Sequence, residues 1–215
     1  MKKIENLIII LGFILLYSCK SNQQKANDKV YYDEFYSVLN SLIRFSFSDV
    51  SAISYKTIPI IKPPWKPSFQ SPDSVSLPDP NSNNVICYNW LSFYSIAKRR
   101  DLDTVDVNYM YHSIDSSKIF VIDSSRICIP VITKSEFLAL FQDSGINKGY
   151  ERIQKKYGSS CYISVSSPIF NADHSKLILS INYYCGPVLG YGYEFVLRKK
   201  MGKWRVIDKE MTWES

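Results

Sequence analysis

The last quarter of the chain most restricts its fold, because four strand-like segments follow one another there. Gly, Pro, Asn and Asp residues separate the segments, and these residues favour tight turns. Short connections join antiparallel neighbours, so the pattern predicts a C-terminal four-strand antiparallel meander. The segments cover residues 161–170, 176–184, 191–199 and 203–207.

The register of the first hairpin follows from the alternation of its side chains. A turn centred on Asp173 places Cys161 opposite Cys185. Since successive strand residues point to opposite faces, the apolar residues of both strands then share one face. We therefore expect a Cys161–Cys185 disulfide or a close contact. The other expected pairs are Ile163 with Tyr183, Val165 with Ile181, and Ile169 with Leu177.

The other cysteines fit the same interpretation. Cys19 aside, the chain has Cys87, Cys128, Cys161 and Cys185, an even set that suits a disulfide-permissive compartment. Three pairings are formally possible. If Cys161 and Cys185 pair, Cys87 and Cys128 form the remaining pair. The absence of a CxxC spacing argues against a redox motif and a zinc knuckle.

Apolar residues at helical spacing predict an amphipathic helix over residues 31–45 and a second helix over 84–99. Thr133-Lys134-Ser135-Glu136 forms a capping box for a short helix that ends at Phe141. A further helix is expected over 150–157, and strand-like pieces over 118–123 and 126–132. These elements predict an α+β fold with helices packed on a curved antiparallel sheet. A cystatin-like cone is one form of it by analogy.

Seven prolines lie between residues 59 and 80 and predict an extended loop, because proline lacks a backbone donor and restricts its predecessor. Within it, Pro63-Pro64-Trp65-Lys66-Pro67 suits a polyproline-II face with Trp65 as an aromatic anchor for a partner. The simpler interpretation, which we favour, is a segment that wraps the domain surface.

The N-terminus combines Met1-Lys2-Lys3 with an apolar run over residues 7–16. This pattern is typical of an export signal. The run is too short to span a membrane, which needs about 20 apolar residues. The end of the run, Leu16-Tyr17-Ser18-Cys19, resembles the lipobox of bacterial lipoproteins, with Tyr17 larger than the usual occupant. The resemblance implies that the Cys19 thiol carries a diacylglycerol and that the signal is cut before it. The alternative is an ordinary secretory signal that ends at a cysteine.

The expected organisation is a signal over 1–18, a flexible tether over 19–29 and a single α+β domain over 30–215. No Asp follows Cys19 directly, and in lipoprotein sorting this implies the outer membrane. Cleavage leaves 197 of the 215 residues, and the net charge falls from +6 to +5 because Lys2, Lys3 and Glu5 are removed. The whole chain is 46% hydrophobic, which is enough for a substantial core.

Residues 164–215 are similar to the C-terminal part of a group of uncharacterised bacterial proteins, many of them lipoproteins. In that group a second Cys-Gly follows the first, whereas Leu189 stands at that position here. The difference excludes a local bridge and favours a partner elsewhere for Cys185. The resemblance implies a shared architecture and transfers no activity. It is carried by Ser167-Pro168-Ile169-Phe170, Asp173, Cys185-Gly186, Gly190-Tyr191-Gly192, Gly202-Lys203-Trp204 and Trp213-Glu214-Ser215.

Few residues suggest a catalytic or metal-binding role. The two histidines, His112 and His174, are more easily explained as a strand-edge and a turn residue than as catalytic or metal-binding groups. Asp101, Asp103 and Asp106 alternate like calcium ligands, but the glycine and terminal Glu of an EF-hand are missing. A solvated acidic turn is the simpler interpretation. The sequence contains no G-x-S-x-G, H-E-x-x-H or Walker-type motif, and we predict no catalytic set, metal site or cofactor.

Basic residues gather around the expected tip of the last hairpin: Arg198, Lys199, Lys200, Lys203, Arg205 and Lys209. Anionic lipid headgroups or envelope polymers are candidate ligands for Arg198, Lys200 and Lys203. The alternative, which we favour at this point, is a solvated edge whose lysines prevent unwanted strand pairing.

These features predict a non-enzymatic envelope lipoprotein that acts as a binding or accessory subunit. Its expected partners are the membrane, through the lipid anchor, and an envelope protein or glycan. Nucleic acid is not a sensible partner for an exported lipoprotein. The competing interpretation is an envelope hydrolase that uses His112 or His174 with a nearby carboxylate.

Overall fold

The computed structural model describes residues 29–54, 60–61, 86–87, 102–114, 121–141 and 145–215. The fold is α+β, with four helices and a mixed seven-stranded sheet in this described part. The chain divides into two compact units, residues 1–38 and residues 39–215. None of the helices within these described ranges is both long enough and apolar enough to cross a bilayer.

A helix over residues 29–46 confirms the predicted helix over 31–45. Its first ten described residues belong to the first unit, and the rest of the helix belongs to the second unit. The apolar stripe that predicted the helix is buried along its whole length, as expected for an amphipathic helix. The stripe consists of Phe35, Val38, Leu39, Leu42 and Ile43.

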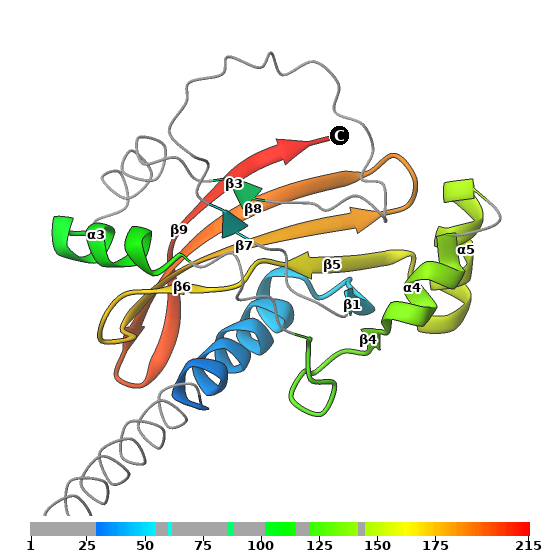
Figure 1. Cartoon of the computed structure of the whole chain (residues 1–215). Helices are drawn as coiled ribbons and strands as arrows, with labels where there is room; N and C mark the ends of the chain where they lie inside the picture. Colours follow the sequence, from blue (N-terminus) through cyan, green and yellow to red (C-terminus); the bar gives the residue numbers. More distant parts are fainter. Residues whose placement is uncertain (1–28, 55–59, 62–85, 88–101, 115–120, 142–144) are drawn as a thin grey trace, which may run out of the picture. The chain divides into compact units, whose positions relative to one another are not determined.

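The second unit contains the seven-stranded sheet, in which six strands follow the order β4-β1-β5-β7-β8-β9 and β6 pairs with β7 (Figure 1). A separate parallel pair is formed by β2 (Ile60–Ile61) and β3 (Ile86–Cys87). The strands of the main sheet are β1 (Ala52–Ser54), β4 (Val131–Ile132), β5 (Cys161–Val165), β6 (Ile169–Phe170), β7 (Lys176–Cys185), β8 (Gly190–Lys200) and β9 (Lys203–Glu214).

The C-terminal meander is present as predicted, because β5, β7, β8 and β9 pair antiparallel in chain order. The sheet as a whole is mixed rather than antiparallel. The short strand β1 lies between β4 and β5 and runs parallel to both. A three-residue strand shows no periodic pattern, and its partners are distant in sequence, so local patterning does not predict it.

The predicted register holds from the disulfide end to the middle of the first hairpin. Cys161 faces Cys185, Ile163 faces Tyr183, and Val165 faces Ile181. Beyond this point the prediction is wrong by one residue, since Ile169 faces Ile178. Ser166 and Pro168 explain the shift. The backbone N–H of Ser180 donates to Ser166 Oγ at 3.0 Å, and proline offers no ladder donor, so β5 and β6 are separate strands.

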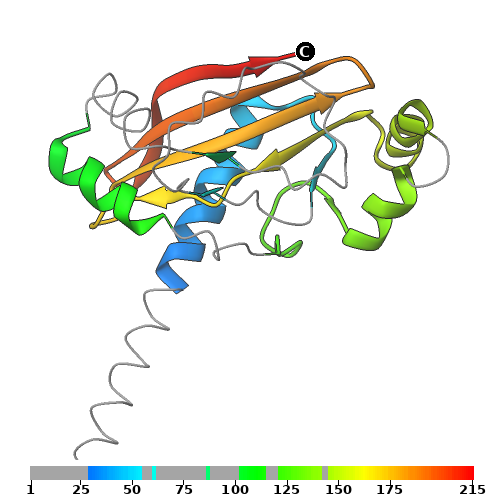
Figure 2. The ribbon, with the colours of Figure 1, turned by 45° about the horizontal axis from the view of Figure 1, so that its top comes forward.

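Three helices cover one face of the sheet: α3 (Thr104–Ser113), α4 (Lys134–Phe141) and α5 (Gly145–Tyr157). One hydrophobic cluster joins α3 to Ile178, and another joins α4 and α5 to Tyr184. Ile178 and Tyr184 are an even number of residues apart on β7, so they point to the same face. Figure 2 shows α3 at one end of the sheet and α4 with α5 at the other end.

Residues of the opposite face meet Phe47, which follows the long helix. Its ring stacks on Tyr183 with the centroids 6.4 Å apart and contacts Phe195 edge-on at 6.1 Å. With both faces covered, all five residues of β5 are buried. The central strands therefore have two core faces, whereas the sequence pattern suggested one.

Several predicted elements differ in extent or type. The capping box is confirmed, because Thr133 N donates to Glu136 Oε2 at 2.8 Å and Glu136 N donates to Thr133 Oγ1 at 3.3 Å. The helix predicted over 150–157 begins earlier, at Gly145. The strand predicted over 126–132 shortens to β4, because the Asp123 side chain accepts from Ser125 N at 2.9 Å and turns the chain.

Other predictions fall mainly outside the described residues. This applies to the signal, nearly all of the tether, most of the Pro-rich loop over 59–80, most of the helix over 84–99 and half of the strand over 118–123. Two exceptions are corrections. β2 lies within the predicted loop, and β3 lies within the predicted helix. Their isoleucines favour strand pairing, and this preference prevailed over the pattern of the surrounding residues.

Candidate functional site

The predicted site residues lie in different parts of the chain. Cys19 and Trp65 are outside the described residues, so lipidation and an aromatic anchor stay predictions. The backbone of Cys87 belongs to β3, but its side chain is also outside the described part. Cys128 is exposed and carries a free thiol in this structure, and its pairing with Cys87 stays a prediction.

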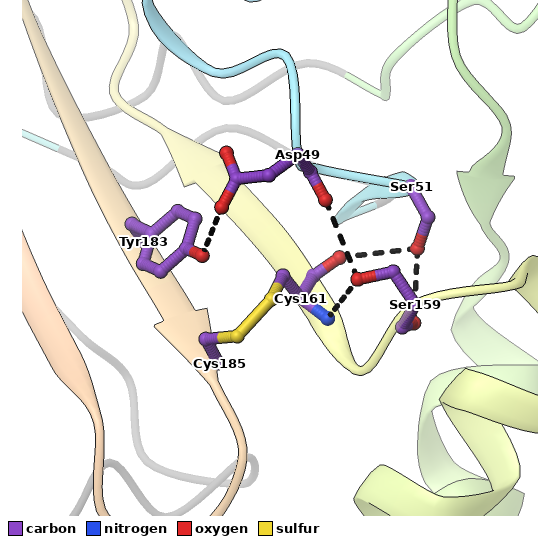
Figure 3. The surroundings of a disulfide bond; sticks show 6 residues. All are labelled: Asp49, Ser51, Ser159, Cys161, Tyr183 and Cys185. Carbon is purple, nitrogen blue, oxygen red and sulfur yellow. Dashed lines mark hydrogen bonds between the residues drawn. A yellow bond between two sulfur atoms is a disulfide. The ribbon is translucent and has the colours of Figure 1, made fainter.

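The expected disulfide between Cys161 and Cys185 is present. It joins the first residue of β5 to the last residue of β7, as Figure 3 shows. Around it, Ser51 Oγ donates to the carbonyl oxygens of Ser159 at 3.0 Å and Cys161 at 3.2 Å. Cys161 N in turn donates to Ser159 Oγ at 3.2 Å. These contacts fasten the segment before β1 to the disulfide end of the meander.

Tyr183 lies beside the disulfide, and its hydroxyl donates to Asp49 Oδ2 at 2.5 Å (Figure 3). Burial and then this hydrogen bond raise the pKa of the Tyr183 phenol above its ordinary value. The group is therefore a neutral donor at physiological pH rather than a base. Its ring also stacks on Tyr191, with the centroids 4.4 Å apart and the planes 10° apart. Sequence reasoning missed the Asp49–Tyr183 contact, since the two residues are distant in the chain.

Trp213 occupies a notch made by two glycines of β8. A Cβ at Gly192 would lie 2.1 Å from Trp213 Nε1, and one at Gly190 would lie 3.0 Å from the indole ring. The indole N–H donates to Asn182 Oδ1 at 2.9 Å. The pattern Gly190-Tyr191-Gly192 with a distant Trp213 thus has a packing explanation, because only glycine leaves room for the indole.

Other residues of the C-terminal pattern also have structural roles. Asp173 shapes the β6–β7 turn, where its Oδ1 accepts from Ser175 N at 3.0 Å. Hydrogen bonds from Ser175 hold the pKa of the Asp173 carboxyl below its usual value. Gly186 and Gly202 have φ angles of +76° and +73°, which favour glycine. Trp204 packs against Phe170 with the ring centroids 6.1 Å apart.

The two histidines make aromatic contacts at separate places. His112 is exposed on α3, with its ring edge-on to Tyr111 at 5.8 Å between the centroids. His174 lies in the β6–β7 turn and stacks on Phe170 at 5.0 Å. The position of His174 confirms its predicted place in a turn. His112 lies on a helix, however, and not at the edge of a strand.

Two of the predicted acidic residues, Asp103 and Asp106, stabilise α3 and its contact with the sheet. Asp103 is the N-cap of α3 and accepts from Asp106 N at 2.7 Å. Asp106 accepts from Asn171 Nδ2 at 2.8 Å and pairs with the Lys176 ammonium, which is also 3.8 Å from Asp103 Oδ2. Asp101 lies outside the described residues. The ranges that the structure describes contain no group of three or more His, Cys, Asp or Glu side chains that could hold a metal.

The predicted basic residues converge at the β8–β9 hairpin. Arg198 faces Arg205, and one pair further out Lys200 faces Lys203. Because the pairs are two residues apart along each strand, all four side chains point to one face of the hairpin. We call Arg198, Lys200, Lys203 and Arg205 the basic quartet. Three of its members are the predicted ligand-binding residues.

The structure also adds a residue to this region and removes one. Lys176 faces Arg198 across β7 and β8, so it lies beside the basic quartet. A turn at Gly186-Pro187 would have predicted this pairing from the sequence. Lys209 does not belong to the tip. It faces Phe195, and its ammonium lies 3.6 Å from the Tyr193 ring centroid.

Comparison with models of known protein families, with curated proteins and with solved structures gives no significant match.

Proposed function

We propose that this chain is a lipid-anchored protein of the bacterial outer membrane and that it acts by binding, as an accessory subunit for an envelope protein or glycan. The observation that carries the proposal is Cys19, which follows Leu16-Tyr17-Ser18 at the end of an apolar run and a basic start. Acyl chains contribute about 0.8 kcal/mol per buried methylene, so a doubly or triply acylated cysteine anchors a protein stably.

The Cys161–Cys185 disulfide supports export from a different part of the chain. Disulfides persist in oxidising compartments such as the periplasm and are rare in the cytosol. The bridge lies about 140 residues from the lipobox, and its prediction did not use the lipobox pattern. Two unrelated features thus favour the same compartment.

Binding is favoured over hydrolysis because the side chains that could take part in catalysis make contacts that stabilise the fold. The His174 ring stacks on Phe170, the Asp106 carboxylate pairs with Lys176, and the Tyr183 phenol is held by Asp49. The basic quartet, in contrast, presents its charges at the end of a hairpin. We therefore propose that a surface of the molecule, rather than a catalytic centre, carries its function.

Metabolic labelling with palmitate tests the anchor. The wild-type chain should take up label, and Cys19→Ala should abolish the uptake. Cys128→Ala is the matched control, because Cys128 is an exposed free thiol whose loss should leave the labelling unchanged. Equal labelling of wild type and Cys19→Ala would refute lipidation at this cysteine.

Affinity purification of the anchored protein tests the binding role. Cross-linking in intact cells before extraction should recover a defined envelope protein or glycan with the wild type. The Cys19→Ala variant should recover much less of it, because the protein is no longer held at the membrane. If a purified chain instead turned over envelope substrates, with activity lost in His112→Ala or in His174→Ala, the hydrolase alternative would replace the binding role.

A further inference from the structure

The basic quartet has an arrangement that the isolated protein does not favour. Like charges directly opposite each other on neighbouring strands are destabilising, and here two such pairs follow in succession. Residues 195–207 include five basic residues and no acidic one. The acidic residue nearest the tip on β9 is Asp208, so the like-charge repulsion between Lys200 and Lys203 acts beyond the last carboxylate of the hairpin. A bound anion would relieve it.

The inner edge of this region contains an ion pair. Lys176, next to Arg198, pairs with Asp106, and the two side chains are 18% and 12% exposed. Further out, Lys200, Lys203 and Arg205 are exposed. The charged groups are thus more exposed toward the tip, where solvent or a ligand can reach them.

The apex of the hairpin is apolar. Met201 occupies the turn with a φ angle of +50° and is 93% exposed, the largest exposure among the large hydrophobic residues described. On the face opposite the quartet, Lys199 pairs with Trp204, and its ammonium lies 6.0 Å from the indole centroid. An apolar apex, a collar of cations and a tryptophan just behind them are the features of a segment that rests in a membrane interface.

We propose that the β8–β9 hairpin tip docks on the surface of a membrane that contains anionic phospholipids. The basic quartet contacts the phosphates of the headgroups, and Met201 enters the boundary between headgroups and acyl chains. A lipid surface is favoured over an anionic glycan because only the lipid offers an apolar layer for Met201. The proposal rests on the lipid anchor proposed above, which would keep the tip close to a membrane.

Oxidation of methionine side chains tests this docking in the full chain. Purified protein is mixed at low salt with vesicles of phosphatidylglycerol and phosphatidylcholine, or of phosphatidylcholine alone, and treated briefly with peroxide. Sulfoxide at Met201 and Met211 is then measured by mass spectrometry. Met211 is the internal control, because it is 46% exposed on β9 and lies roughly 30 Å along the strand from Met201 at about 3.3 Å per residue. Anionic vesicles should slow oxidation of Met201 several-fold and leave Met211 unchanged.

Two matched variants identify the charges responsible. In Lys200→Gln/Lys203→Gln, the lipid concentration for half-maximal protection of Met201 should rise roughly 30-fold, since each cation near an anionic surface contributes about a factor of five. Lys200→Arg/Lys203→Arg should retain protection. Lys155→Gln, at an exposed position of α5, should behave like the wild type. An unchanged oxidation rate at Met211 shows that a variant keeps its fold.

The outcomes separate the tip from the anchor. Equal Met201 oxidation with anionic and neutral vesicles would overturn the docking proposal, as would full protection in the double glutamine variant. Flotation of the same samples reports the anchor independently. Association with both vesicle types without protection of Met201 would leave the anchor intact and refute the tip, whereas association with neither would refute both.

Discussion

The two ends of strands β7 and β8 differ in how their side chains are satisfied. At one end, Cys185 is bonded to Cys161, Tyr183 contacts Asp49 and Tyr191, and Trp213 fills the notch at Gly192. At the other end, like charges face each other and a methionine points into solvent. The side chains of the first end have their partners within the chain, whereas for the second end we propose an external, anionic partner. Under this proposal, stability and recognition belong to opposite ends of the same strands.

At the end of the sheet that carries Cys185, the disulfide should make the largest contribution to the free energy of unfolding. Replacing both cysteines in Cys161→Ala/Cys185→Ala opens a loop of 24 residues and should lower the free energy of unfolding by about 3 kcal/mol. Urea denaturation without reductant measures the loss. Adding reductant should bring the wild type to the same midpoint, and Cys128→Ala should change little. A loss below about 1 kcal/mol would mean that the packing of this end does not depend on the bridge.

The Trp213 notch should have the next largest effect. Gly192→Ala places a Cβ where the indole and Thr212 Oγ1 lie, so we expect a loss of about 2 kcal/mol from overpacking. A double-mutant cycle sharpens the result. In Gly192→Ala/Trp213→Ala the contact with the indole is removed and only that with Thr212 Oγ1 remains, so the double variant should be more stable than the sum of the single losses predicts. Strict additivity would show that the two positions do not interact.

The pair of helices α4 and α5 contributes to the stability of the fold in a pH-dependent way. The Lys156 ammonium, with hydrogen bonds from Thr133, lowers the pKa of Glu136 to about 2. A lowered folded-state pKa stabilises the fold above the unfolded pKa, near 4.5, and the contribution disappears as the pH falls through about 2. Since Glu136 is partly solvent-screened, we expect Glu136→Gln to lose only about 1 kcal/mol at pH 6.

Denaturation of wild type and Glu136→Gln between pH 6 and pH 2 measures this contribution. The difference between the two proteins should shrink toward zero as the pH approaches 2. Glu151→Gln, at an exposed carboxylate of α5, controls for the loss of one charge. A difference that stays constant over this range would assign the effect to the shape of the amide rather than to ionisation.

The smallest effect, with the opposite sign, belongs to the hairpin tip. Lys200→Glu turns a like-charge pair with Lys203 into an opposite-charge pair, so it should stabilise the fold by a few tenths of a kcal/mol. The gain should vanish in 1 M salt, which screens exposed charges beyond about 3 Å. The same variant should lose protection of Met201 by anionic vesicles. A loss of stability would show that the tip is already completed within the chain.

The meander could be predicted from sequence because its signals are local. Alternation and turn residues identified the strands, and the Asp173 turn set the register as far as Val165 and Ile181. The register changes where Ser166 replaces a ladder contact with its side chain. The end of β9 was not foreseen, because the segment after Ile207 is mostly polar and exposed. On such an edge strand, burial does not impose an alternation of polar and apolar residues.

The sequence predicted those parts of the candidate sites that depend on pairing between neighbouring strands of a hairpin. The disulfide and the convergence of Arg198, Lys200 and Lys203 follow from hairpin register. The helix α3 was missed, although Asp103 as an N-cap before Val107 and Met110 is a usable signal. The contact between Asp49 and Tyr183 could not be predicted, since it depends on how distant segments pack.

The short strand β1 has a consequence for the order of folding. Ile53 pairs with Val131 and with Ile163, which are roughly 80 and 110 residues away along the chain. Closing loops of this length costs entropy before any contact is gained, whereas the hairpins of the meander close over short turns. We therefore expect the meander to form first and to serve as the template on which β1 docks late. An intermediate with formed hairpins and an open β5 edge is then the species most exposed to wrong strand pairing.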